Sequence, residues 1–190
     1  RPCRSPLLPP LIEKGADVHA LNFEPNTPLM YAGLETAKIL IEQGADINYQ
    51  NPFGRTALWW IYFRGNNEAA EYLLDAGAKL PETGTQDAYD LLRMALRCGS
   101  MKFLEKSLRR GLDPLVESEA KNTLLHHAAA SNSIELVNKL FEMGVPFNKA
   151  NIYGWTPLHS AAYYGAQAVV EWLIKKGFEK NARTIDGKTP

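Results

Sequence analysis

The chain has 190 residues, of which 45% are hydrophobic, 10% aromatic and 22% charged, so it can bury a sizeable core and is not a disordered tail. Its 21 Lys and Arg residues balance its 21 Asp and Glu residues, and this neutral charge argues against binding of a nucleic acid. No apolar run reaches the roughly 18 residues of a membrane-spanning helix. The two cysteines, Cys3 and Cys98, match no disulfide framework and no metal spacing.

Glycines recur along the chain at a nearly constant interval. The steps between successive members are 29, 33, 34, 33 and 33 residues, and each glycine follows an apolar stretch. This pattern predicts repeated helices, each of which ends at a residue with a left-handed backbone. A second, parallel series has Asn132 where its other members have glycine, and Asn tolerates that conformation best after glycine. The first series is Gly15, Gly44, Gly77, Gly111, Gly144 and Gly177, and the second is Gly65, Gly99, Asn132 and Gly165.

A short motif opens each repeated unit. Threonine can cap the free N–H groups of a helix start, and proline fits the first helical turn. Each unit is therefore expected to hold a helix, a turn and a second helix. Turn-forming residues such as Asn51–Gly54 then predict a hairpin that projects from the helix pair. The motifs are Thr27-Pro28-Leu29, Thr56-Ala57-Leu58, Asp90-Leu91-Leu92, Thr123-Leu124-Leu125 and Thr156-Pro157-Leu158.

The sequence of the units resembles that of a known repeat family. Thr156-Pro157-Leu158-His159-Ser160-Ala161 is similar to the ankyrin-repeat signature, Thr-Pro-Leu-His-x-Ala at a period of 33 residues. The segment Gly44-Ala45-Asp46-Ile47-Asn48 resembles the stretch between such repeats. The resemblance covers about residues 7–190. It implies an all-α repeat solenoid, an ankyrin-type stack of helix-turn-helix units with projecting β-hairpin loops.

The repeat register predicts a single domain over residues 1–190, and because the chain begins without Met and stops at the start of a motif, we expect it to be a piece of a longer protein. The expected units are a partial repeat at 7–21, repeats at about 22–50, 51–84, 85–117, 118–150 and 151–183, and the start of a further repeat at 184–190.

Two departures from the register are expected. Thr27 and Gly44 are 17 residues apart, where Thr56 and Gly77 are 21 apart, so about one helical turn is missing from the first full helix pair. The extra residue in the 34-residue step is assigned to a longer or differently shaped loop at 79–89. In the fourth full unit, Ile134, Val137, Leu140 and Phe141 have the spacing of one helix face, which predicts a core stripe.

The four histidines are the first candidates for catalysis or metal binding. His126 and His159 each lie three residues after a motif threonine, and the resemblance implies that their imidazoles bond to that threonine and join one unit to the next. No nucleophile, phosphate-loop or metal-ligand motif is present. We therefore expect a protein that is not an enzyme, with no cofactor and no metal site.

Aromatic and arginine side chains recur at the loop tips and at the ends of the first helices, which the resemblance implies are the concave binding surface. Tyr, Trp and Arg dominate interface hot spots, although each ring could instead pack on a neighbouring loop. The candidate partner-binding residues are Tyr31, Phe53, Arg55, Trp60, Phe63, Arg64, Tyr89, Met94, Arg97, His127, Tyr153, Trp155, Tyr163 and Tyr164.

The favoured function is a non-catalytic protein-protein interaction module that binds another protein, as scaffold, adaptor or inhibitor. One alternative is an aromatic-lined sensor of a nucleotide or oligonucleotide, with an anion site at Arg55, Arg64 and Arg97. Another is the targeting domain of a longer enzyme. We expect a monomeric, soluble and cytoplasmic protein without membrane or nucleic-acid partners.

Overall fold

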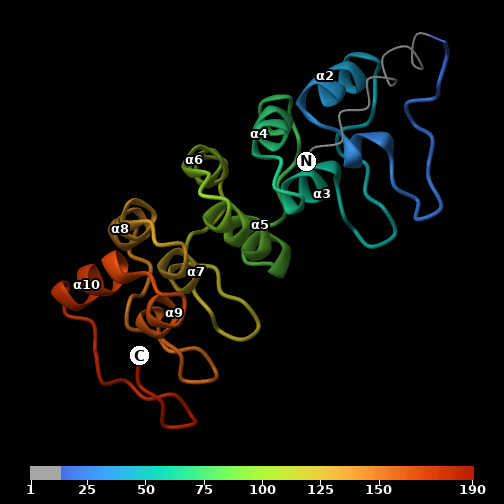
Figure 1. The fold of residues 1–190 in the computed structure, drawn as a ribbon. Helices are drawn as coiled ribbons and strands as arrows, with labels where there is room; N and C mark the ends of the chain where they lie inside the picture. The colour runs from blue at the N-terminus through green and yellow to red at the C-terminus, as the bar shows by residue number, and fades with distance from the viewer. Residues whose placement is uncertain (1–13) are drawn as a thin grey trace. The chain divides into compact units, whose positions relative to one another are not determined.

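The computed structural model describes residues 14–190, so Cys3 and the beginning of the expected partial repeat at 7–21 lie outside the described residues. The described chain consists of short helices joined by turns and reversing loops (Figure 1). It forms two compact units, one that ends at Lys79 and one that runs from Leu80 to Pro190. They are called the first unit and the second unit below.

Within residues 14–79, the first unit contains two helix pairs, and the first helix of this stretch is short. This helix is a single 3₁₀ turn, η1, where the corresponding helix of the next repeat, α3, has seven residues. Thr27 precedes η1 without a side-chain cap bond, whereas Thr56 accepts a hydrogen bond from the N–H of Trp59. The predicted loss of one turn is therefore confirmed, and it falls in the first helix. The elements are η1 (Pro28–Tyr31), α2 (Leu34–Glu42), α3 (Ala57–Phe63) and α4 (Asn67–Asp75).

The second unit contains three helix pairs, in which the first helices pack side by side. α7 contacts both α5 and α9, and α8 contacts α10 (Figure 1). The elements are α5 (Gln86–Arg97), α6 (Met101–Arg109), α7 (Leu124–Ala130), α8 (Ile134–Glu142), α9 (Pro157–Tyr163) and α10 (Gln167–Lys175).

Helix α5 begins earlier than its motif predicts. Its N-cap is Thr85, whose hydroxyl accepts a hydrogen bond from the N–H of Ala88 at 3.2 Å, and the helix has 12 residues where α7 and α9 have seven. The loop expected at 79–89 is differently shaped and not longer, because Gln86–Tyr89 already form the first turn of α5. The expected helix start at Asp90 is wrong.

The other reversing loops share one closing pattern. The N–H of Asn151 donates to the carbonyl of Trp155, and the Asn151 side-chain oxygen accepts from the N–H of Trp155 at 3.0 Å. Asn51 and Arg55 form the same pair in the first unit. The loops reverse as expected but contain no β-strand within residues 14–190, and only Glu117 and Thr123 form an isolated bridge. Asn22 with Asn26, Ser118 with Asn122, and Thr184 with Lys188 repeat this closure.

The core consists of apolar side chains on the helix faces that pack against neighbouring helices. Val137 and Leu140 are fully buried, as predicted, but Ile134 is 41% exposed and Phe141 is only partly buried, whereas Leu136 is buried. Asn132 has a φ of 55°, which confirms the left-handed backbone predicted for its slot. No helix in the described part of the chain is both long and apolar enough to cross a membrane.

Candidate partner-binding surface

An aromatic cluster covers the first helices of the first unit. Trp59 stacks on Phe63 with ring centroids 4.9 Å apart, and Trp60 stacks on Tyr31 at 6.3 Å. Trp59 and Trp60 also meet edge to face at 5.3 Å. The indole N–H groups of both tryptophans are buried without a hydrogen-bond partner within the described residues, so the two indoles are held by ring contacts.

Two of the candidate arginines lie on these rings. The guanidinium of Arg55 is 4.3 Å from the ring centroid of Trp59, and that of Arg64 is 5.1 Å from the centroid of Tyr31. Such cation–π contacts contribute about 0.5–1 kcal/mol at exposed sites. Arg55 and Arg64 therefore order the cluster as well as charge it.

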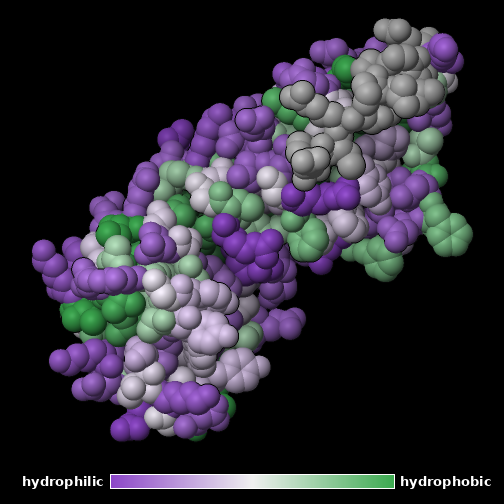
Figure 2. Space-filling view, viewed as in Figure 1, coloured by the Kyte–Doolittle hydropathy of each residue, from purple (hydrophilic) through white to green (hydrophobic). Residues whose placement is uncertain are grey.

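Several candidates in the first unit are exposed as expected. Phe53 is 77% exposed at a loop tip, Phe63 is 47% exposed and Tyr31 is 40% exposed. Figure 2 shows apolar side chains standing out from the loops of this unit. Trp60 is partly buried by its neighbours, so its exposed area is smaller than the sequence suggests.

In the second unit, α5, α7 and α9 line a cavity of about 470 Å³ that is partly open to solvent. A neighbouring, shallow and more open cavity of about 480 Å³ lies toward the loop before α7, and the two share Arg93, Asn122 and His127. The residues that line the first cavity, which we call the α5–α9 cavity, are Arg93, Arg97, Asn122, His126, His127, Ala130, Ser131, Trp155, Ser160, Tyr163 and Tyr164.

Three predicted aromatic residues form one wall of the α5–α9 cavity. Trp155 meets Tyr163 edge to face with centroids 5.5 Å apart, and Tyr163 meets Tyr164 in the same way at 5.1 Å. Tyr163 is 72% exposed and Tyr164 is 65% exposed, whereas Trp155 is partly buried. Tyr153 is 51% exposed on the loop before α9 but does not line this cavity.

Three candidates on α5 and α7 are less accessible than predicted. Met94 and Tyr89 are each only 2% exposed, so the expectation that both belong to the free surface is wrong. Tyr89 is buried because α5 begins early, so that a residue expected in a loop belongs to the first turn of a helix. His127 is partly buried, and its Nε2 lies 2.6 Å from the Tyr89 hydroxyl. Arg97 is exposed in the last turn of α5, as expected.

The sequence did not single out Arg93, Asn122, Ser131 and Ser160 as cavity residues. Arg93 lies four residues before Arg97 in α5, so helical spacing alone could have placed the two on one face. The repeat register could have placed the other three, because Asn122, Ser131 and Ser160 occupy the same repeat positions as the candidates Trp155, Tyr164 and His127, 33 residues away.

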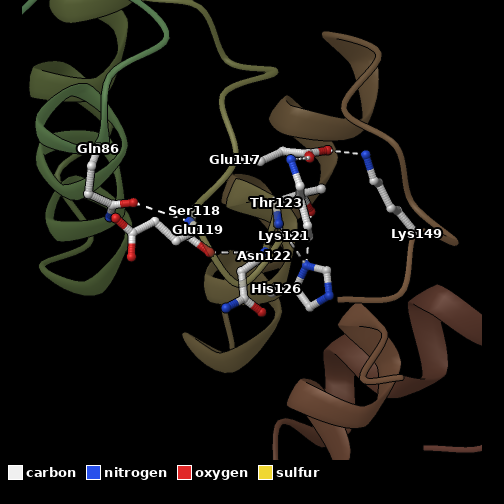
Figure 3. A network of polar contacts seen from close by, with 9 residues as sticks. All are labelled: Gln86, Glu117, Ser118, Glu119, Lys121, Asn122, Thr123, His126 and Lys149. Carbon is white, nitrogen blue, oxygen red and sulfur yellow. Dashed lines mark hydrogen bonds and ion pairs between the residues drawn. The ribbon is translucent and has the colours of Figure 1, made fainter. Parts of the chain in front are cut away.

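A network of polar contacts fixes the loop before α7 (Figure 3). The N–H of Glu119 donates to Oε1 of Gln86 at 3.3 Å, which ties this loop to α5. Lys149 donates to Glu117, which ties it to the following loop. The Asn151 amide also donates to Oδ1 of Asn122 at 2.8 Å. The loop is therefore anchored on both sides, and the cavity wall that it forms is preorganised.

The two motif histidines join each repeat to the next loop. Nδ1 of His126 accepts from the N–H of Thr123 at 3.1 Å, so Nε2 carries the proton and donates to the Trp155 carbonyl at 3.0 Å. His159 makes the same contacts with Thr156 and with the Lys188 carbonyl, at 3.2 and 3.3 Å. The expected structural role of both histidines is confirmed.

Burial keeps the histidines of the cavity uncharged. It lowers the pKa of His127 to about 4, with a smaller contribution from the positive charge of Arg93. Burial also lowers the pKa of His126, against the hydrogen bonds to Trp155 and Thr123 that favour its protonation. No group of three or more His, Cys, Asp or Glu side chains that could hold a metal ion occurs in residues 14–190.

Comparison with known proteins identifies the repeats. The family model for ankyrin repeats, in three copies, matches residues 3–84 and 91–184. The chain belongs to the ankyrin-repeat family. The gap between the matched segments, residues 85–90, coincides with the N-cap and first turn of α5.

Similar ankyrin proteins have diverse names. The chain is 27% identical over 176 residues to a "Transient receptor potential cation channel subfamily A member 1 homolog" of Caenorhabditis elegans, which covers 90% of this chain. It is 31% identical over 100 residues to the mouse RelA-associated inhibitor, which covers 52% of this chain. The chain spans only 14% and 12% of these relatives.

The fold also matches a solved structure. The crystal structure of the human ASB11 ankyrin repeat domain superposes with a TM-score of 0.77 and 26% identity, covering 96% of this chain and 83% of that one. Ankyrin repeats are protein-interaction modules, and the fold is generally non-catalytic, although some relatives are parts of larger enzymes.

Proposed function

We propose that this chain binds a partner protein through the first helices and loops of its ankyrin repeats and supplies no catalytic group itself. The observation that carries this proposal is the α5–α9 cavity, because Tyr163 and Tyr164 stand exposed beside it on a wall of packed rings. Tyrosine contributes large contact area at a small cost in conformational entropy, which makes it a frequent anchor of interfaces.

The rigidity of the surface supports the same function. The loop before α7 is held on both sides by Gln86 and Lys149, and His126 fixes the Trp155 backbone at the cavity wall. A preorganised surface loses little entropy when it binds, so more of the contact energy remains as affinity. Such a module can recruit a partner as a scaffold or adaptor, or inhibit it by covering a site; the mouse RelA-associated inhibitor carries the second role in its name.

Affinity capture with matched variants tests the proposal. The immobilised chain, its Tyr163→Ala/Tyr164→Ala variant and its Ile174→Ala variant are compared for the proteins they retain from an extract of the source cells. Ile174 is 45% exposed on α10, outside the α5–α9 cavity, and serves as the control. Proteins retained by the parent chain and by Ile174→Ala should be lost with the double variant. The double substitution should weaken the binding free energy by about 2 kcal/mol or more. Equal retention by all three folded chains would move the binding surface elsewhere.

Salt dependence separates this function from the oligonucleotide alternative. Binding to a phosphate backbone weakens steeply with ionic strength, whereas an interface dominated by aromatic contacts changes little. We expect capture to persist when the salt concentration is raised.

A further inference from the structure

The α5–α9 cavity has an unbalanced charge. None of the residues that line it carries a carboxylate, although two arginines do line it. Arg93 is already paired, since its Nε and Nη2 donate to Oδ1 of Asp90 at 3.1 and 3.0 Å. Arg97 is exposed and makes no ion pair within residues 14–190. The C-terminus of α5 offers it only a partial negative charge.

The other titratable side chains of the cavity do not alter this balance near neutral pH. His127 and His126 are uncharged there, because burial lowers the pKa of each imidazole. The tyrosines of the opposite wall contribute hydroxyl groups and ring faces. The net charge of the lining is therefore positive, and it is carried by Arg97.

The neighbouring cavity has the opposite character. Its lining includes the carboxylates of Asp90 and Glu119, and Glu119 is exposed. Asp90 is paired with Arg93, which also lines this cavity, so Glu119 makes the net charge of its lining negative. A negatively charged ligand group placed there would meet Glu119, whereas the same group placed in the α5–α9 cavity would meet Arg97. The two cavities together therefore restrict where an acidic group can lie.

We propose that the α5–α9 cavity binds an acidic peptide segment of the partner, with an Asp or Glu carboxylate at Arg97 and an adjacent apolar or aromatic side chain against Tyr163 and Tyr164. This inference rests on the proposed function and names the chemistry of the partner at that site. Arginine binds a carboxylate through parallel N–H donors, which gives direction as well as strength. The exposed ring faces of the two tyrosines lie across the same cavity and favour a side chain that buries apolar area.

Selection from a displayed library of random peptides tests the inference without a known partner. The library is selected on the parent chain, on Arg97→Glu and on Arg109→Glu. Arg109 is an exposed arginine of α6 outside both cavities, paired with Glu105 at 3.6 Å, and serves as a control for a charge reversal elsewhere on the surface. Peptides selected by the parent should be enriched in Asp or Glu next to aromatic or apolar residues. Their affinity should fall about tenfold or more with Arg97→Glu and stay unchanged with Arg109→Glu.

The charge reversal gives a second readout. A direct selection on Arg97→Glu should enrich Lys or Arg at the position that the parent fills with Asp or Glu, which a merely misfolded variant would not do. Selected peptides without acidic enrichment, an unchanged affinity with Arg97→Glu, or failure to select any peptide would overturn the inference. Tighter binding of a labelled single-stranded oligonucleotide than of the peptides would overturn it as well. The proposed function would still hold if the inference failed but the parent chain captured proteins that the Tyr163→Ala/Tyr164→Ala variant did not.

Discussion

The Tyr89 hydroxyl and Nε2 of His127 lie 2.6 Å apart and join α5 to α7 at the wall between the two cavities. Burial raises the pKa of Tyr89 to about 12, and burial lowers that of His127 to about 4. Both side chains are therefore neutral at physiological pH, and the hydrogen bond between them is one between uncharged groups. This pair exists only because Tyr89 belongs to the early first turn of α5.

The first prediction concerns the pH dependence of stability. The folded pKa of His127, about 4, lies below its ordinary value of 6.5, so between these values the unfolded chain binds more protons than the folded chain. The free energy of unfolding should therefore fall as the pH falls from about 6.5 to about 4, with His127 contributing up to about 3 kcal/mol. His126 adds to this loss with the same sign, because its pKa is lowered too.

Urea denaturation near neutral pH and near pH 4.5 measures this effect. In His127→Gln the group that takes up the proton on unfolding is gone, so the difference between the two conditions should shrink. A variant that loses as much stability on acidification as the parent chain would contradict the assignment of a buried, neutral His127.

The second prediction concerns the histidine that links two repeats. In His126→Phe, the N–H of Thr123 loses its Nδ1 acceptor and the Trp155 carbonyl loses a donor, at a site that is 3% exposed. We expect the free energy of unfolding to fall by about 1–3 kcal/mol. His159→Phe should cost less, because its bond to the Lys188 carbonyl is longer, 3.3 Å against 3.0 Å.

Parallel thermal melts of the two variants provide the comparison. The order of the losses matters more than their size, because both substitutions place a ring of similar volume in similar surroundings. Equal melting temperatures for His126→Phe and the parent chain would show that this linkage adds nothing to stability.

Much of the fold could be predicted because the same local sequence signals recur in each repeat. A Gly or Asn with a left-handed backbone follows the helices, as at Asn132 with its φ of 55°, and such positions can be recognised without tertiary information. The loss of one turn from the first full helix pair was also predictable, since it changes the spacing of Thr27 and Gly44, but that spacing does not say which helix is shortened. The start of α5 was not, because the register assigned Asp90 to a motif slot while Thr85 provides the cap in the folded chain.

The candidate surface was harder to predict than the fold. The sequence gives the slot of a residue, but burial depends on what the neighbouring repeat places against it. Tyr163 and Tyr164 remain exposed at the end of α9, whereas Met94 is covered although it occupies a slot expected to face outward. The cavity itself depends on the packing of α5 against α7 and of α7 against α9, which no single repeat encodes.

The third prediction tests the core of the second unit. Leu140→Ala removes a side chain that is fully buried in α8, and we expect it to cost about 2–5 kcal/mol of unfolding free energy. Ile134→Ala, in the same helix, is the control, because a side chain that is 41% exposed loses less buried area. Denaturant titrations of both variants should therefore give clearly different midpoints. A loss at Leu140 no larger than that at Ile134 would contradict the packing described for α8.

The last prediction concerns the extra turn of α5, on which the position of Tyr89 depends. Thr85→Ala removes the hydroxyl that accepts the Ala88 N–H, a change that costs about 0.5–2 kcal/mol at a helix N-cap. We expect hydrogen exchange to become faster over Gln86–Tyr89, because that turn then frays, while the amides later in α5 keep their protection. Thr83→Ala is the control for the same loop, because Thr83 bonds to the Asp113 N–H and not to α5. Unchanged exchange in Gln86–Tyr89 of Thr85→Ala would mean that the burial of Tyr89, and not the threonine cap, holds the early turn of this helix.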